Sequence, residues 1–294
     1  MNLVHVTSTP PMLAASACAS IGLLELPPSI ERLIITIGSN DEPLLSPDNQ
    51  TGAIAFEPIV AGLIKPSPRL WVVPAAVAAS DGIASMRVLS SQGSPEHKHA
   101  SSLSRPTAST SLKIGKTHEV QLVPTIAMRN FLSLIPAHMQ LWHMKTDMQG
   151  YDALALSNEG SALRRLHYIN SETWLSKTIA YEDAHNDFCE DLWPIMRRQG
   201  FRLVALYDRH RFSDQLTPTA LKHAKLHGPS AESEAAKVCK FWATKVVPQG
   251  HTAWEGEAYF MRNDTTMPLP PVYKGCAYCE SLRKAALEAQ GGGP

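Results

Sequence analysis

Short apolar runs that recur along the chain most constrain what this sequence can fold into. Several of them end in Gly, Asn, Asp or Glu, and six stand out: Leu33–Ile37, Ala53–Phe56, Leu70–Val73, Leu141–Met144, Leu166–Ile169 and Phe201–Tyr207. Continuous apolar runs of this length are typical of parallel strands that are buried on both faces. Segments with helical spacing follow or separate them, at Met128–Leu134, Tyr151–Leu156, Glu182–Gln199 and Ala231–Ala243. The pattern predicts an α/β domain with a mostly parallel central sheet.

The first two runs end in residues that suit a nucleotide. Gly38, Ser39 and Asn40 follow the first run, and Glu57 follows the second, 19 residues after Gly38. Neighbouring parallel strands place such ends together, where a glycine turn can approach a ligand and an acid can bind ribose hydroxyls. One glycine is not the full G-x-G-x-x-G pattern. An ordinary turn and a solvated acid therefore remain the alternative.

Composition narrows the class of protein and its partners. The 294 residues can form one large α/β domain with appendages, and the 27 Lys and Arg residues balance the 27 Asp and Glu residues. A net charge of zero gives no reason to expect nucleic acid or an anionic membrane as the partner. The apolar segment Met12–Leu26 is short, contains Glu25 and follows no Lys or Arg, so we expect neither a signal peptide nor a membrane span.

The organisation expected along the chain has three parts. Residues 1–30 read as an irregular lead-in, residues 31–210 as the main domain, and residues 211–294 as a C-terminal extension that packs on or caps it. A Ser-rich polar insertion interrupts the domain at about 90–118. The five cysteines are odd in number and scattered, which favours a reduced, cytoplasmic protein over a disulfide framework.

Five segments carry a resemblance to a known family. In chain order they are Ile35–Asn40, Ala55–Pro58, Val72–Val77 with Ser80–Gly82, Met144–Gly150 and Tyr168–Glu172. Together they resemble the FkbM-type family of S-adenosylmethionine-dependent methyltransferases, over about three-fifths of the chain. The resemblance implies a Rossmann-like class I methyltransferase fold, with helices on both faces of a mostly parallel sheet. It also implies S-adenosyl-L-methionine as cofactor and methyl transfer to oxygen of a small-molecule, sugar or lipid-like acceptor.

The resemblance also implies which residues hold the cofactor. A glycine loop would wrap the methionine and sugar, Glu57 would bind both ribose hydroxyls, and residues after the third strand would contact adenine. The full cofactor-binding set is Gly38, Ser39, Asn40, Glu57, Pro58, Ala76, Asp81 and Asp147. Pro58 is expected to direct the chain away from its strand rather than to do chemistry.

The catalytic candidates that the resemblance implies are Asp147, Lys145 and Glu172. Three roles stay open for Asp147: binding the methionine ammonium, orienting an acceptor hydroxyl, or removing its proton. Lys145 either serves the site or pairs with an acid such as Asp147. His143 and His185 are alternative bases, although a histidine is more often structural. No metal site is predicted, because the C-x-x-C pair at Cys276 and Cys279 has no second pair beside it.

Two departures from the family leave other functions open. Thr36 stands where the family commonly has an acid, and Asp41-Glu42-Pro43 replaces further loop glycines. These changes favour a second hypothesis, a non-catalytic methyltransferase-like protein that serves as a binding or scaffold module. A nicotinamide-dependent oxidoreductase is a third hypothesis, since such enzymes share the sheet, but the glycine pattern they use is missing.

Overall fold

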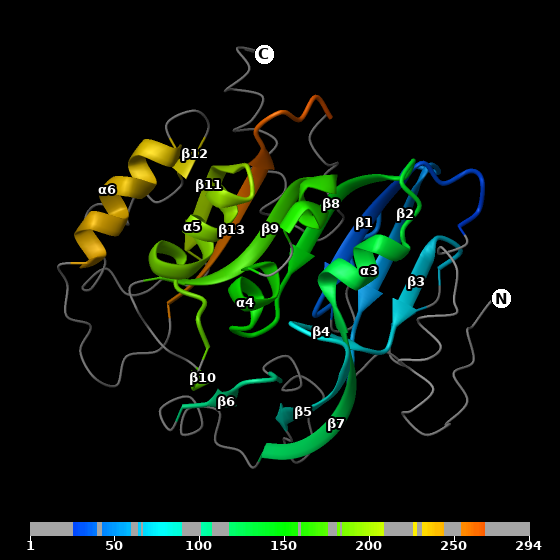
Figure 1. Cartoon of the computed structure of the whole chain (residues 1–294), viewed down its shortest axis with the longest axis horizontal. Coiled ribbons are helices and arrows are strands. Elements are labelled where there is room, and N and C mark those ends of the chain that lie inside the picture. Colours follow the sequence, from blue (N-terminus) through cyan, green and yellow to red (C-terminus); the bar gives the residue numbers. More distant parts are fainter. Residues whose placement is uncertain are drawn as a thin grey trace.

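A central eight-stranded sheet organises the computed structural model of this chain (Figure 1). The structure describes residues 26–39, 43–59, 64–65, 67–89, 101–107, 118–157, 160–175, 181–182, 184–208, 226–227, 231–243 and 254–267. The sheet order is β12-β11-β13-β9-β8-β1-β2-β3. The strands are β1 (Arg32–Ile37), β2 (Thr51–Phe56), β3 (Leu70–Val73), β8 (Gln140–Thr146), β9 (Leu166–Leu175), β11 (Phe201–Asp208), β12 (Leu226–His227) and β13 (Trp254–Arg262).

The sheet is mostly parallel, as the apolar runs predict. β3, β2, β1, β8 and β9 form consecutive parallel pairs, whereas β13 pairs antiparallel with both β9 and β11. β12 is antiparallel to β11 at the edge. All six predicted strands are present, and the α/β class is confirmed. The sheet also takes β13 from the segment 211–294, so that segment contributes more than a cap.

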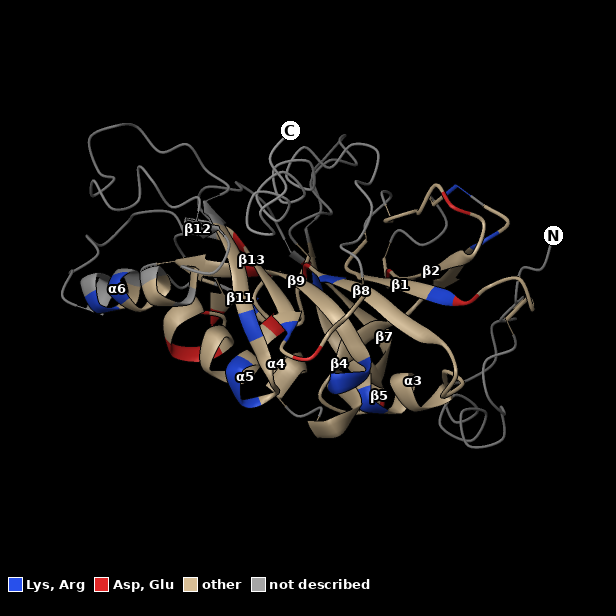
Figure 2. Ribbon diagram, turned by 90° about the horizontal axis from the view of Figure 1, so that it is seen from above, with Lys and Arg blue, Asp and Glu red and all other residues tan. Residues whose placement is uncertain are grey.

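The helices of the described chain gather mainly on one side of the sheet. α3 (Met128–Leu134), α4 (Asp152–Ser157) and α5 (Trp193–Arg198) lie below it in Figure 2. They cover a continuous apolar core in which the rings of Phe56 and Phe131 meet edge to face, with centroids 4.6 Å apart. Helices on both faces are therefore not confirmed for the described residues. None of the described helices has the length and apolar character needed to cross a membrane.

The helical segment predicted at Glu182–Gln199, in which Pro194 suggests a kink or a break, starts later and changes type just before that proline. It begins as a π-helix, η4 (Phe188–Leu192), capped by the Asp187 carboxylate, which accepts from the backbone N–H groups of Cys189 and Glu190. α5 follows directly, with Pro194 in its first turn. Proline is tolerated there because that N–H has no partner within the helix.

Two smaller sheets lie beside the main one. β4 (Ala76–Ala78) is parallel to β7 (His118–Ala127), which pairs antiparallel with β5 (Gly82–Leu89). β6 (Arg105–Pro106) pairs with β10 (Tyr181–Glu182). The predicted insertion thus leaves from β5 and returns at β7, and its described part, 101–107, is held against β5 and β10.

A disulfide corrects the expectation of a fully reduced protein. Cys189 at the start of η4 is bonded to Cys239 of α6 (Ala231–Ala243), with Cα atoms 5.5 Å apart. The two residues are 50 positions apart in sequence, and α6 reaches η4 by packing beside β11. Spacing in the sequence could not reveal this pair, because the contact is made by the fold. Cys276 and Cys279 lie outside the described residues.

Arg165 holds the carboxyl end of α3. This residue ends the 3₁₀ helix η3 (Gly160–Arg165), and its guanidinium donates to the backbone carbonyls of Leu132, Ile135 and Pro136. Burial lowers the pKa of the Arg165 side chain from its ordinary value. One side chain therefore adds three hydrogen bonds where α3 ends, at carbonyls of which Leu132 also accepts from Ile135 N–H (3.4 Å) and Pro136 from Met139 N–H (3.0 Å).

We predict that Arg165→Met lowers the free energy of unfolding by about 1–3 kcal/mol, because it removes three hydrogen bonds from a charged donor to carbonyls at the end of α3. Urea denaturation followed by circular dichroism measures the change. The neighbouring Arg164→Met is the matched control, since Arg164 has an exposed side chain. Equal losses in the two variants would contradict the capping role.

Candidate functional site

The ends of β1, β2 and β8 converge at the carboxyl edge of the sheet. Ile37 is in register with Phe56 on one side and Thr146 on the other, so Gly38, Glu57 and Asp147 follow at the same level. Backbone hydrogen bonds extend this alignment past the strands: Gly38 N–H donates to the Phe56 carbonyl (3.0 Å), and Asp147 N–H donates to the Ile37 carbonyl (3.0 Å). The structure thus brings these three predicted residues together.

Gly38 is required by a close approach between two turns. Its φ is +70°, and a Cβ at this position would lie 2.0 Å from the backbone oxygen of Asp147. No side chain fits in that space, and a left-handed backbone also disfavours other residues. Gly38 was predicted to form a ligand-binding turn. In the structure it allows the Asp147 loop to lie beside the end of β1.

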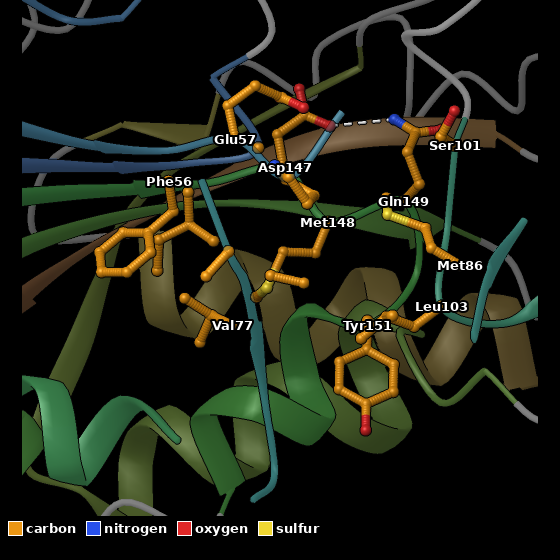
Figure 3. A pocket seen from close by; sticks show the side chains of 15 residues that line it. Phe56, Glu57, Val77, Met86, Ser101, Leu103, Asp147, Met148, Gln149 and Tyr151 are labelled. Carbon is orange, nitrogen blue, oxygen red and sulfur yellow. Dashed lines mark hydrogen bonds between the residues drawn. The ribbon is translucent and has the colours of Figure 1, made fainter. Parts of the chain in front are cut away.

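A pocket of about 510 Å³, open to solvent, lies over this junction (Figure 3). Its polar side chains include Glu57, Asp147 and Gln149, which gather at one side. Apolar side chains across from them include Val77, Leu103 and Met148. Gly38, Pro58 and Ala76 complete the predicted residues that line it. Apolar walls with a few polar groups are typical of small-molecule sites.

Glu57 is a buried acid rather than a solvated one. Its exposed fraction is 4%, and the backbone N–H of Ile59 donates to its Oε1 at 2.8 Å. This hydrogen bond fixes the carboxylate at the end of β2. Burial of an acid beside a pocket is costly unless polar partners compensate it, so the structure removes the solvated strand-end alternative.

The Gln149 side chain binds two of the acidic catalytic candidates, Asp147 directly after β8 and Glu172 on β9. Its Nε2 donates to Asp147 Oδ1 (2.9 Å) and to Glu172 Oε2 (3.2 Å). Its Oε1 accepts from the Tyr181 hydroxyl (3.0 Å), and its backbone oxygen accepts from Ser102 Oγ (2.9 Å). Asp147 and Glu172 are therefore held by one amide, which segments far away in the sequence fix in place.

The backbone around Gln149 is in an uncommon conformation. Gln149 has φ of +52°, and Gly150 has φ of +92° with no room for a Cβ, which would lie 2.5 Å from the Trp174 ring. A non-glycine residue in the left-handed region costs on the order of 1–3 kcal/mol, and such residues cluster at functional sites. Gly150 therefore serves the backbone geometry of this loop.

Lys145 lies beside this pair of acids. Its Nζ is 3.8 Å from Asp147 Oδ2, which confirms the expected pairing of Lys145 with an acid. His143 is two residues before it on β8, and burial together with the Lys145 charge lowers the pKa of His143 to about 3. His143 therefore stays neutral and is a poor base near pH 7. His185 is exposed and does not line the pocket.

Asp81 is not brought to the pocket. Its carboxylate accepts from the backbone N–H of Ala127 (2.7 Å) and from Asn130 Nδ2 (2.6 Å), at the amino end of α3. Asp81 is exposed and serves this helix end, which has orphan N–H groups and a favourable dipole for an acid. The predicted contact with adenine has no support from this position.

The glycine-loop segment is only partly described. Asn40 lies outside the described residues. The hydroxyl of Thr36 accepts from the backbone N–H of Leu44 (3.2 Å), so this residue ties the two ends of the loop without a carboxylate. Ser39 is 5% exposed, and its Oγ has no hydrogen-bond partner among the described residues. Ser39 does not line the pocket, but it directly follows Gly38, which does, and its buried hydroxyl could accept a polar partner there.

Two buried residues missed by the sequence reasoning support the Asp147 loop from below. Asp152, the first residue of α4, accepts from the Met148 backbone N–H. Asn186 donates to Asp152 (3.4 Å) and to the Glu172 carbonyl (3.1 Å), and accepts from Ala153 N–H (3.0 Å). Asp152 could have been found from the sequence, because an acid at the start of a predicted helix is a common signal for such a role. No such signal in the sequence marked Asn186, because its partners come from two separate segments, the start of α4 and β9.

Comparison with protein-family models gives no match for this sequence, and comparison with curated proteins gives no significant match. Among solved structures, similarity is found to a mutant of the 16S rRNA (adenine(1408)-N(1))-methyltransferase from Catenulisporales acidiphilia. The sequence identity is 12%, the alignment covers 87% of this chain and 94% of that one, and the TM-score is 0.31.

Asp152 makes stability depend on pH. Burial, and then the neighbouring Asp147 charge, raise the pKa of Asp152 from 3.8 to about 7. Between these values the folded chain keeps a proton that the unfolded chain has lost. This group therefore makes the unfolding free energy fall as pH rises from about 4 to 7, by up to about 1.4 kcal/mol per pH unit.

We predict that Asp152→Asn flattens this decline, because the amide keeps an acceptor for Met148 N–H and does not titrate. Urea denaturation at several pH values between 4 and 7 measures the slope. Asp264→Asn is the control, since Asp264 is an exposed acid with a lowered pKa and no part in this loop. An unchanged slope in Asp152→Asn would show that the acid is ionised in the folded state.

Proposed function

We propose that this chain is an S-adenosylmethionine-dependent methyltransferase of the class I type, acting on oxygen of a small-molecule, sugar or lipid-like acceptor. The observation that carries the proposal is the position of the pocket. Chain order along the sheet reverses between β1 and β8, and the pocket lies at the carboxyl ends of these strands. Open α/β sheets bind their ligands at such a switch point.

The strand order supports the same reading. If the edge strand β12 is left out and the other seven strands are numbered in chain order, the order across the sheet is 3-2-1-4-5-7-6. Strand 7, which is β13, is antiparallel to both of its neighbours. A mostly parallel sheet is what the resemblance to class I methyltransferases implies. Four of the five segments that resemble the FkbM-type family lie on β1, β2, β8 and β9, and three of them run past the carboxyl ends of β1, β2 and β8 into residues that line the pocket.

The residues present fit the cofactor. The buried carboxylate of Glu57 can bind two neighbouring ribose hydroxyls. The Ser39 hydroxyl has no hydrogen-bond partner among the described residues and can bind a polar group of the cofactor. Ala76 and Met148 belong to the apolar wall that a flat base would cover. Asp147, aligned by Gln149 and paired with Lys145, would hold the methionine ammonium.

Bound S-adenosylmethionine supplies an electrophilic methyl group, whose transfer breaks a carbon–sulfur bond, forms a carbon–oxygen bond and leaves S-adenosylhomocysteine. The chain must then hold the acceptor in line, exclude water and receive the hydroxyl proton. Glu172 is the residue to which we assign the proton. It lies one strand beyond Asp147, is 3% exposed, and is oriented by the same Gln149 amide.

The cofactor site is tested by binding. We expect the wild-type chain to bind S-adenosylhomocysteine in calorimetric titration and Glu57→Gln to bind it about 10- to 100-fold more weakly, since hydrogen bonds to a charged acceptor contribute about 1.5–3 kcal/mol. Glu31→Gln, just before β1 at the opposite end of that strand, is the control and should bind normally. Absence of binding by the wild-type chain would overturn the proposal.

The proton acceptor is tested by turnover. We expect Glu172→Gln to lower transfer of labelled methyl groups into a deproteinised metabolite extract by about 100-fold or more, with unchanged affinity for S-adenosylhomocysteine. Exposed Glu182→Gln is the control. Normal transfer in Glu172→Gln would reject its role. Cofactor binding with no transfer by the wild-type chain would favour the non-catalytic, methyltransferase-like hypothesis instead.

A further inference from the structure

Two hydrogen bonds reach Gln149 from outside the pocket. The Ser102 hydroxyl donates to its backbone oxygen (2.9 Å), and the Tyr181 hydroxyl donates to its side-chain Oε1 (3.0 Å). Gln149 lines the pocket, and the two donors stand behind it. The donors are far apart in the sequence but belong to one small structure. Ser102 lies three residues before β6, and Tyr181 is the first residue of β10, which pairs with β6.

The Gln149 side chain is held at both ends of its amide. A carboxylate accepts hydrogen bonds and does not donate them, so the NH2 end faces Asp147 and Glu172. The oxygen end points the other way, to the Tyr181 hydroxyl. The terminal torsion of glutamine has only broad preferences, so a contact at one end alone leaves the amide free to swing. Contacts at opposite ends restrict it to one position beside both acids.

Tyr181 is itself firmly held. Its exposed fraction is 4%, and its ring stacks on that of Trp174, with centroids 6.0 Å apart and 17° between the ring planes. The Trp174 ring also lies against Gly150, where a Cβ would approach it to 2.5 Å. Gly150 directly follows Gln149, so the contacts return to the residue where they began. This closed circuit fixes the Tyr181 hydroxyl relative to the Gln149 amide.

Ser102 is held just as closely, by β5. It is 1% exposed, and its backbone exchanges two hydrogen bonds with Arg87 (2.8 and 3.1 Å). Its hydroxyl accepts from the Ser104 backbone N–H (3.1 Å) while it donates to the Gln149 carbonyl. Gln149 has φ of +52°, a conformation that persists only where its surroundings stabilise it. Ser102 therefore anchors the backbone of Gln149, and Tyr181 anchors its side chain.

We propose that Ser102 and Tyr181 are positioning residues for methyl transfer, and that both act through Gln149. This inference rests on the proposed methyltransferase function. In that reaction Asp147 holds the cofactor and Glu172 receives the proton, so their relative position decides whether methyl donor and acceptor are in line. A misplacement of about 1 Å can cost on the order of 100-fold in rate. The described part of the polar insertion thereby gains a role in the site.

The rigidity of Gln149 is the first test, on the chain alone. Tyr181→Phe keeps the ring that stacks on Trp174 and removes only the hydroxyl. In nitrogen-15 relaxation measurements, we expect the order parameter of the Gln149 side-chain NH2 group to fall from a rigid value in the wild type to below about 0.6. Tyr168→Phe is the matched control, because Tyr168 is also buried and its hydroxyl donates to the Met267 carbonyl (2.7 Å). An unchanged order parameter in Tyr181→Phe would overturn the proposal.

Turnover separates positioning from a general loss of stability. At saturating S-adenosylmethionine, we expect Tyr181→Phe to lower transfer of labelled methyl groups into the metabolite extract about tenfold, and Tyr168→Phe to leave it unchanged. Gln149→Asn withdraws the amide from both acids, and asparagine tolerates the left-handed backbone. Tyr181→Phe should cause no further loss in the Gln149→Asn background, because its effect passes through that amide. Losses that add in the double variant would reject the role.

Ser102→Ala gives a second reading if Tyr181→Phe fails to fold. It removes the hydroxyl that binds the Gln149 backbone, so we expect the same loss of order in the Gln149 amide and a severalfold lower transfer rate. Ser133→Ala is its control, since the exposed Ser133 hydroxyl donates to the Asn130 carbonyl (2.6 Å) away from the pocket. Equal behaviour of the two serine variants would contradict the role of Ser102.

The two proposals fail in different ways. If S-adenosylhomocysteine does not bind, the proposed function is wrong, and a positioning role in methyl transfer is wrong with it. If S-adenosylhomocysteine binds and Gln149 stays rigid in both Tyr181→Phe and Ser102→Ala, the methyltransferase proposal stands and the positioning roles are rejected.

Discussion

The site depends on one close contact, between Gly38 and the backbone oxygen of Asp147. A side chain at residue 38 would overlap that oxygen, so the turn after β1 and the loop after β8 approach as closely as two backbones can. The register of β1 with β2 then places Glu57 beside them. The absence of one Cβ therefore lets the two turns that line the pocket meet.

The loop that follows Asp147 is held from several sides. Asp152 and Asn186 support it from beneath, Ser102 of the insertion binds the Gln149 carbonyl, and Tyr181 binds the Gln149 amide. These contacts come from segments separated by tens of residues. They stabilise a left-handed Gln149 that isolated backbone preferences oppose, and they aim its amide at two acids at once. Rigid support of this kind is what precise positioning of reactants requires.

Local signals in the sequence were enough to predict the sheet and part of the site. Apolar runs marked the strands because parallel strands are buried on both faces, and strand ends marked Gly38, Glu57 and Asp147 because those ends share one edge. Asp81 was predicted to contact the cofactor, but an acid near a strand end can equally bind the start of a helix. Its carboxylate accepts from Ala127 N–H, 46 residues further along the chain. The Cys189–Cys239 bond, Asn186 and the pairing of Glu172 with Glu257 depend on contacts between distant segments, which spacing along the chain does not encode.

The position of β13 has a consequence for how the molecule is made. This strand is the last in the chain among those described in the sheet, yet it lies between β9 and β11, which precede it. Until residues 254–262 leave the ribosome, β9 and β11 have no strand to join them, and the facing edge of each presents unpaired backbone groups. Joining of the five parallel strands to β11 therefore waits for β13, although β11 itself comes earlier in the chain.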